Sequence, residues 1–421
     1  MNIFKPADIL IPNPSIDFSK WSVVACDQYT SQPEYWEQAA RLAADSPSTL
    51  NIIFPEVYLN DGHDEERINS INRTMEQYLA DGIFNELKNS FIFVERTQSN
   101  GKIRKGIIGC LDLEEYDFSK GSQSKIRATE GTILSRIPPR QKIRRNAPLE
   151  LPHILMLIDD RTAGVIEPVS RAKGDLKKLY DFDLMLGGGH IAGWLVNESM
   201  QKQICDALDA LADPQAFEEK YGVQNQGVLL FAAGDGNHSL ATAKTCWEEL
   251  KKTLSPQEQE NHPARYALVE LNNIHDEALE FEPIQRVVFG VNPEKLLNGM
   301  FDYYSGASFE PNGGQEIRYT YQGKEGSIYI QNAPSNLPVG TLQKYLDVYL
   351  EKNGGEVDYI HGDDVVRSLT QKENTIGFMV DRMEKKDLFT TVIKDGALPR
   401  KTFSMGEAQD KRFYLECKRI R

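Results

Sequence analysis

The stretch VLLFAAGDGNHSLATAK, residues 228–244, runs from an apolar segment through a polar loop into a sequence with helical spacing. The apolar residues predict a buried strand, and residues 240–254 predict the helix that follows the loop. The loop combines two glycines with an acid, an amide, an imidazole and a hydroxyl: Gly234, Asp235, Gly236, Asn237, His238 and Ser239. We therefore predict a strand–loop–helix unit whose loop carries reactive side chains.

This loop has the features of an anion site. A loop that closes a strand and opens a helix points several backbone N–H groups in one direction, and the helix dipole adds partial positive charge. Glycines permit a sharp turn and a close approach of the backbone to a ligand. Asp235 could hold Mg²⁺ or accept a proton, and His238 could donate to a phosphate oxygen. The alternative is a capped turn, with Asn237 or Ser239 capping the helix and Asp235 bonding within its own loop.

The common nucleotide and hydrolase motifs do not describe the loop. Ser239 stands where G-x-G-x-x-G needs its third glycine, and no strand-end acid follows about twenty residues later, which argues against a dinucleotide fingerprint. The chain contains no G-x-x-x-x-G-K-[ST], no H-E-x-x-H and no G-x-S-x-G. The loop therefore predicts a phosphate site of a different type.

Two further segments offer groups for an anion. Residues 130–145 are rich in cations within an acidic chain, and Arg side chains bind phosphate oxygens in pairs. Pro138 and Pro139 predict an extended loop there, whose cations are Arg136, Arg140, Lys142, Arg144 and Arg145. A solvated basic loop is the alternative. The second segment, with Gly188, Gly189 and His190, could approach a phosphate or an adenine, or could form a tight turn.

Composition limits the class of protein. The chain has 421 residues, with 48 Lys and Arg against 62 Asp and Glu, and a net charge of −14. An acidic chain of this kind is a poor partner for nucleic acid or an anionic membrane. The five cysteines form no C-x-x-C, which favours reduced thiols. With no signal-like N-terminus and no long apolar run, we expect a cytoplasmic protein, and an oligomer is possible.

The order of strands and helices predicts the fold class. Strands and helices mix without a strict βαβ rhythm, which favours an α+β fold with mixed sheets and surrounding helices. We expect a hairpin from residues 91–97 and 106–113, a short strand within residues 162–171, and a final strand over residues 411–420. A polar stretch at residues 212–226 suggests a boundary between an N-terminal part, residues 1–215, and a C-terminal part, residues 216–421.

The loop and other segments resemble a known family. AAGDGNHSLATAK resembles ADGHHRYEAA, a signature of the domain-of-unknown-function family numbered one-thousand-and-fifteen. FEPIQRVV, residues 281–288, resembles that family's ILPTHRVV, and LPRKTFSM, residues 398–405, resembles its MPPKSTYF. Further segments match in the same order along the chain: FKPADILIPNP, VVACDQYTSQPEYW, NIIFPEVYL and KGIIGCLDLEEYD.

The family's loop signature is in turn similar to the phosphate-binding motif of the ParB/sulfiredoxin-like fold, which includes the free serine kinases. This resemblance implies a nucleotide-binding core that takes ATP or ADP with Mg²⁺. Ser239 replaces the arginine of that motif, and the loop lacks the cysteine that sulfiredoxin needs. Glu130 is a candidate general base, because the serine kinases use a carboxylate in that role. Arg286 and Lys401 lie in matching motifs and are predicted to line the same cleft.

The sequence thus predicts phosphoryl transfer from a nucleotide to a small hydroxylated metabolite, possibly free L-serine. Asp235, His238 and Glu130 are the predicted catalytic residues, and Asp235 is also the predicted metal ligand. The alternative is a non-catalytic, nucleotide-binding regulatory protein, which the loss of the motif arginine favours. A metal-dependent phosphatase is a third reading, but the loop offers few metal ligands.

Overall fold

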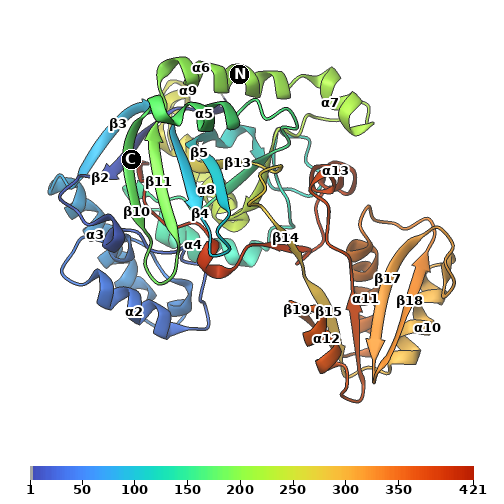
Figure 1. Cartoon of the computed structure of the whole chain (residues 1–421). Helices are drawn as coiled ribbons and strands as arrows, with labels where there is room; N and C mark the ends of the chain where they lie inside the picture. Colours follow the sequence, from blue (N-terminus) through green and yellow to red (C-terminus); the bar gives the residue numbers. More distant parts are fainter. Residues whose placement is uncertain (1–2) are drawn as a thin grey trace. The chain divides into compact units, whose positions relative to one another are not determined.

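The computed structural model describes residues 3–421 (Figure 1). The chain divides into two compact units. Unit 1 comprises Met1–Ala128, Thr132–Leu279 and Glu407–Arg421, and unit 2 comprises Thr129–Gly131 and Glu280–Gly406. The boundary expected between residues 215 and 216 falls inside unit 1, within the helix Pro214–Tyr221, so the observed division differs from the expected one.

Unit 1 is built on one mixed sheet, ordered β10-β11-β4-β5-β13-β9-β12-β7-β6, with β1 also paired to β5. The pairs β13–β9, β12–β7 and β6–β7 are parallel and the others are antiparallel. Its strands are β1 (Phe4–Lys5), β4 (Ile92–Thr97), β5 (Ile103–Asp112), β6 (Tyr116–Asp117), β7 (Ile126–Ala128), β9 (Leu155–Ile158), β10 (Lys177–Asp183), β11 (His190–Leu195), β12 (Phe231–Asp235) and β13 (Tyr266–Asn273).

Helices and two short ladders complete unit 1. The ladders pair β2 (Ala7–Pro12) with β3 (Phe84–Ser90), and β8 (Leu149–Glu150) with β22 (Lys418–Arg419). The helices are α1 (Phe18–Trp21), α2 (Pro33–Ala43), α3 (Asp64–Ala80), α4 (Ile137–Arg144), α5 (Glu167–Ala172), α6 (Glu198–Leu211), α7 (Pro214–Tyr221), α8 (Asn237–Leu250) and α9 (Pro256–Asn261).

Unit 2 has an antiparallel sheet ordered β16-β18-β17-β20-β15-β19 and a separate pair, β14–β21. Its strands are β14 (Phe281–Pro283), β15 (Gln285–Phe289), β16 (Ala307–Ser308), β17 (Gln315–Tyr321), β18 (Lys324–Ile330), β19 (Glu356–Ile360), β20 (Thr375–Met379) and β21 (Phe403–Met405). Its helices are α10 (Pro293–Tyr303), α11 (Pro338–Asn353), α12 (Asp363–Leu369) and α13 (Lys385–Asp395). The fold is α+β with mixed sheets and surrounding helices, as the sequence predicts.

Local sequence explains where several of these elements begin and end. The Asn197 side chain accepts a hydrogen bond from the backbone of Met200 and so caps α6. Pro214 opens α7, and Gly222 ends it in the left-handed conformation that glycine adopts at little cost. The hairpin of β4 and β5 is confirmed.

Two local predictions are wrong. Residues 162–171 contain helix α5 instead of a strand, because Pro168 fits the first turn of a helix, where its missing N–H costs nothing. The final strand expected over residues 411–420 shrinks to β22, and the rest of that stretch runs extended through the core of unit 1. Arg412 in this stretch is buried and bonds Glu270 and Glu416. Its pairing replaces the regular ladder that alternation alone would predict.

Candidate functional site

The predicted strand–loop–helix unit exists. Strand β12 ends at Asp235, Gly236 follows in the left-handed conformation with φ of 77°, and α8 begins at Asn237. Gly236 occupies the N-cap position, so no side chain caps the first turn of the helix. Asn237 instead donates from Nδ2 to the Ala233 carbonyl. The capped-turn alternative with Asn237 or Ser239 as the cap is therefore wrong.

Gly236 is required by its surroundings as well as by its backbone angle. Strands β12 and β9 are antiparallel, so the end of β12 lies beside the start of β9, with Asp235 opposite Leu155. A Cβ atom on Gly236 would lie 3.0 Å from the Cα atom of Ile154. The same pairing brings His153, which precedes β9, next to the loop.

Asp235 is half-buried and ion-paired. Its Oδ2 atom lies 3.2 Å from Nζ of Lys411, and its Oδ1 atom accepts the Gly236 N–H at 2.8 Å. Burial opposes ionisation of the carboxyl group, but the ion pair with Lys411 outweighs this effect and lowers the pKa of Asp235. The carboxylate is therefore charged at neutral pH, as a metal ligand must be.

His238 is a neutral imidazole at physiological pH. Burial, assisted by the positive charges of Arg136 and Arg140, lowers the pKa of His238 to about 4. Its Nε2 atom accepts a hydrogen bond from the Ile133 backbone N–H at 3.2 Å. The neutral ring consequently carries its proton on Nδ1, which is the atom that can donate to a ligand.

Ser239 makes a contact that the sequence did not predict. Its Oγ atom lies 2.9 Å from Nε2 of His153, and Nδ1 of His153 lies 2.6 Å from the Tyr414 hydroxyl. The Tyr414 oxygen also accepts the Cys26 backbone N–H at 3.2 Å. The carboxylate of Asp27 is 3.9 Å from Nε2 of His153.

A cavity of about 150 Å³ opens beside these residues. Its walls are mostly apolar, and the polar and charged side chains on its lining are those of Cys26, Glu56, Arg140, Arg144, Glu150, His153, Ser239, Thr242 and Tyr414. An apolar cavity with a few convergent polar groups is the usual form of a small-molecule site. The cavity is therefore the candidate site of unit 1.

The basic segment is not the extended loop that its two prolines predicted. Pro138 and Pro139 fit the first turn of α4, and this helix packs against α8. Three of its cations have carboxylate partners: Arg140 bonds Glu56, Arg144 bonds Glu150 and Arg145 bonds Glu249. Arg136 and Lys142 are exposed. Carboxylates therefore offset three of the five cations of the predicted clamp, while Arg136 and Arg140 act electrostatically on His238.

The Gly-rich segment forms the turn between β10 and β11. His190 lies between two carboxylates, with Nε2 2.8 Å from Asp181 and Nδ1 2.8 Å from Asp183. Gly189 is needed because a Cβ atom there would lie 2.2 Å from the Thr97 carbonyl oxygen, and Gly188 is packed against Phe413. In the sheet, β4, β5, β13 and β9 lie between β11 and β12. The turn contacts the C-terminal segment through Phe413, and no predicted residue of the turn lines the candidate cavity.

The three remaining predicted residues belong to unit 2. Glu130 is half-buried and forms an isolated bridge with Leu398, and Lys401 is exposed with φ of 55°. Arg286 is fully buried on β15, where it donates to the carbonyl oxygens of Ile284 and Arg400 and to Gln343. Burial lowers the pKa of Arg286 to about 10.

Because its guanidinium has no exposed surface, Arg286 supports the structure of unit 2 and does not line a cleft. Glu282, four residues before Arg286, lies on β14, and its carboxylate is 3.6 Å from Arg382.

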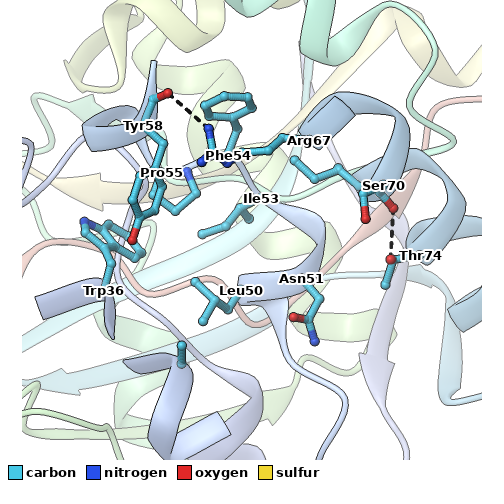
Figure 2. A pocket seen from close by; sticks show the side chains of 12 residues that line it. Trp36, Leu50, Asn51, Ile53, Phe54, Pro55, Tyr58, Arg67, Ser70 and Thr74 are labelled. Carbon is cyan, nitrogen blue, oxygen red and sulfur yellow. Dashed lines mark hydrogen bonds between the residues drawn. The ribbon is translucent and has the colours of Figure 1, made fainter. Parts of the chain in front are cut away.

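A second, larger cavity of about 450 Å³ lies between α2 and α3 (Figure 2). Figure 2 shows Trp36 and Tyr58 on one side and Ser70 and Thr74 on the other, with Arg67 donating to the Tyr58 carbonyl oxygen. Arg67 is already paired with Asp61. None of the residues predicted from the loop lines this cavity, so the smaller one remains the candidate.

Comparison with known families decides where the chain belongs. The family described as "Protein of unknown function (DUF1015)" matches residues 9–349, most of the chain. The chain belongs to this family. No curated protein matches it in sequence.

Solved structures with a similar fold are distant from this DUF1015 member. A free serine kinase variant in complex with ADP has 9% identity and a TM-score of 0.39, with 76% of this chain and 93% of that chain covered. C-terminally truncated SbnI from Staphylococcus aureus has 11% identity, a TM-score of 0.35 and coverages of 71% and 83%. A conserved hypothetical protein from Pyrococcus furiosus has 11% identity, a TM-score of 0.34 and coverages of 75% and 92%.

Sequence reasoning missed three residues at the site of this DUF1015 member: His153, Lys411 and Tyr414. Two of them lie beyond the segment that matches the family, in the C-terminal stretch that returns to unit 1. His153 stood alone in the sequence beside an apolar strand. Its role follows only from the antiparallel pairing of β9 with β12. Within residues 3–421 no helix is long and apolar enough to cross a membrane.

Proposed function

We propose that this protein transfers a phosphoryl group from a nucleotide to a small hydroxylated metabolite. The observation that carries the proposal is the start of α8, where the uncapped first turn lies between an ionised Asp235 and the cavity beside Ser239. Phosphoryl transfer needs N–H donors, cations and a carboxylate more than it needs a covalent nucleophile. The similarity of the loop to the ParB/sulfiredoxin-like motif supports the same reaction class.

In this proposal the first turn of α8 binds the phosphates of ATP or ADP. The first turn of α8 carries backbone N–H groups that have no acceptor within the helix, and the helix dipole favours an anion there. The Nδ1–H of His238 donates to a phosphoryl oxygen, because Nε2 is already occupied by Ile133. The exposed cation of Arg136 adds a charge that attracts the nucleotide.

Asp235 is the proposed ligand for Mg²⁺. One acidic ligand fits this metal, since Mg²⁺ usually binds one or two carboxylates together with substrate phosphates and water. Among residues 3–421 no group of three or more His, Cys, Asp or Glu side chains forms a complete metal site. Mg²⁺ would neutralise charge on the transferred group, while Lys411 keeps the carboxylate ionised when the metal is absent.

The acceptor is proposed to be a small hydroxylated compound, with free L-serine as the first compound to test. The cavity of about 150 Å³ is of the scale of a small molecule. The ion pairs of α4 favour the alternative, a non-catalytic nucleotide-binding regulatory protein. Carboxylates already offset the charges of Arg140, Arg144 and Arg145, so these cations are less available to a phosphoryl group.

Phosphorus NMR of the purified protein tests the proposal. The sample contains Mg²⁺ and ATP or ADP, with or without a pool of hydroxylated metabolites that includes L-serine. We expect a new phosphomonoester signal that depends on the pool. Line broadening of the nucleotide signals without a new product would support the regulatory alternative, and unchanged signals would exclude both.

A further inference from the structure

Ser239, His153 and Tyr414 form a hydrogen-bonded chain on the cavity wall. Oγ of Ser239 lies 2.9 Å from Nε2 of His153, and Nδ1 lies 2.6 Å from the Tyr414 hydroxyl. A nucleophile within reach of a base, with the base held by a third group, is the general arrangement of an activated serine. His153 and Tyr414 are both buried, so the arrangement is fixed by packing.

Two contacts hold His153 between Ser239 and Tyr414. The Tyr414 oxygen accepts the Cys26 backbone N–H, which fixes its position beside Nδ1 of His153. In the tautomer that acts as a base, Nδ1–H donates to the Tyr414 oxygen, and the lone pair on Nε2 faces Ser239 and takes its proton. Burial raises the pKa of the Cys26 thiol, so this cysteine is not the nucleophile.

Ser239 is also well placed for an incoming phosphoryl group. It is the third residue of α8, so its hydroxyl lies at the helix end where the proposed function binds phosphates. The ParB/sulfiredoxin-like motif has an arginine where this chain has Ser239. This chain therefore places a hydroxyl oxygen beside a base at a position where that motif places a positive charge.

We propose that Ser239 is the covalent phosphoryl acceptor of this protein, and that His153 is its general base. The Ser239 oxygen attacks the terminal phosphorus of a nucleoside triphosphate, and the bond from that phosphorus to the bridging oxygen breaks. The nucleoside diphosphate leaves with the bonding electrons, and the Ser239 proton moves to Nε2 of His153. In a second displacement the hydroxyl oxygen of the acceptor attacks the phosphorus of the phosphoserine and releases its proton to water. The bond from phosphorus to Ser239 Oγ breaks, and Oγ takes back the proton held on Nε2 of His153. This inference rests on the proposed function.

The test is phosphorylation of the full-length protein in the absence of an acceptor. Protein is incubated with Mg²⁺ and ATP labelled at the γ-phosphate, and the modified peptide is identified by tandem mass spectrometry. We expect one phosphate on Ser239, no label in Ser239→Ala, and labelling slowed at least about 100-fold in His153→Gln. The glutamine variant keeps a polar group beside Ser239 but cannot take a proton. Thr245→Ala, on the outer part of the same helix, is the matched control and labels normally.

Nucleotide binding is measured on the same samples with a fluorescent ATP analogue. Binding without a phosphate on Ser239, or label that persists in Ser239→Ala, overturns the inference and leaves the proposed function standing. The absence of nucleotide binding overturns the proposed function, and the inference falls with it. Equal labelling rates in His153→Gln and the unmodified protein overturn the role of His153.

Discussion

The Nζ atom of Lys411 lies 3.2 Å from the Oδ2 atom of Asp235, so the C-terminal segment supplies the cation that faces the acid of the central loop. The segment from Glu407 to Arg421 belongs to unit 1 although unit 2 precedes it in the chain. It also supplies Tyr414, which holds His153. The candidate site therefore requires the C-terminal segment Glu407–Arg421, which belongs to unit 1.

Replacing Asp235 by Asn is expected to lower kcat for phosphoryl transfer by about 100-fold or more while nucleotide binding remains measurable. The amide keeps the shape of the side chain but loses the charge that would hold Mg²⁺ and pair with Lys411. Phosphorus NMR gives the turnover, and titration with a fluorescent nucleotide gives the affinity.

Asp112→Asn is the matched control for this change. Asp112 is ion-paired with Arg265 at 2.6 Å and is similarly shielded, but it lies outside the candidate site. We expect it to retain turnover. Equal activity of the Asp235→Asn variant and the unmodified protein would exclude Asp235 from the mechanism.

Arg136→Ala is expected to weaken nucleotide binding about fivefold, the effect of one exposed charge. Arg136 is exposed and contributes to the low pKa of His238. Arg145→Ala should leave the affinity unchanged, because Arg145 is already paired with Glu249. The difference between the variants should shrink as salt is added. A larger loss in Arg145→Ala would contradict this assignment.

His238 is expected to stay neutral from pH 8 down to about pH 5, because its pKa is lowered to about 4. Nitrogen NMR of the imidazole should show the proton on Nδ1. Between the folded pKa and the ordinary value of about 6.5 the unfolded chain binds more protons. His238 therefore makes the protein less stable as pH falls through that window. Titration of the ring near pH 6.5 in the folded protein would refute the prediction.

Gly236→Ala is expected to destabilise the protein more than Gly222→Ala. Both glycines have positive φ, 77° and 63°, so each substitution carries the left-handed strain of about 1–2 kcal/mol. A Cβ atom at Gly222 meets nothing within 4 Å, whereas one at Gly236 lies 3.0 Å from Cα of Ile154. Urea unfolding of the two variants measures the difference in their free energies of unfolding. Equal losses would show that the loop adjusts to the added Cβ atom at Gly236.

Glu270→Gln is expected to cost about 3–5 kcal/mol of unfolding free energy, because it leaves two buried cations without their shared anion. Glu270 bonds Arg104 at 3.2 Å and Arg412 at 2.7 Å inside unit 1. Burial opposes its ionisation, but the two arginines outweigh burial and lower the pKa of Glu270 to about 2.

The same carboxylate predicts acid sensitivity. The contribution of Glu270 to the free energy of unfolding is complete above about pH 4.3, the pKa of a glutamate in the unfolded chain. It is lost as pH falls from there towards 2. Chemical unfolding at pH 7 and at pH 3 measures both effects. Asp206→Asn, which removes an exposed helical pair with Lys202, is the control and should change neither value measurably.

Much of the secondary structure followed from local patterns. The apolar run before Asp235 and the helical spacing after Ser239 predicted β12 and α8, and alternation predicted the hairpin of β4 and β5. Pro138 and Pro139 were misleading at α4, since a proline stops a helix in its interior but fits its first turn. The strand expected over residues 162–171 was also wrong, because this stretch contains α5. The fold class was therefore predictable, whereas the conformation of the cation-rich segment was not.

The sequence by itself determined the loop, its glycines and the family, because these depend on residues that are neighbours in the chain. The tertiary structure decided which side chains share the site. His153 lies beside Ser239 because β9 runs antiparallel to β12. Lys411 and Tyr414 lie in the segment that follows unit 2 along the chain but belongs to unit 1. Two of the carboxylate partners of α4, Glu56 and Glu249, likewise come from distant segments. Hydrogen bonds and ion pairs act over a few ångströms in space, and distance along the chain does not reveal them.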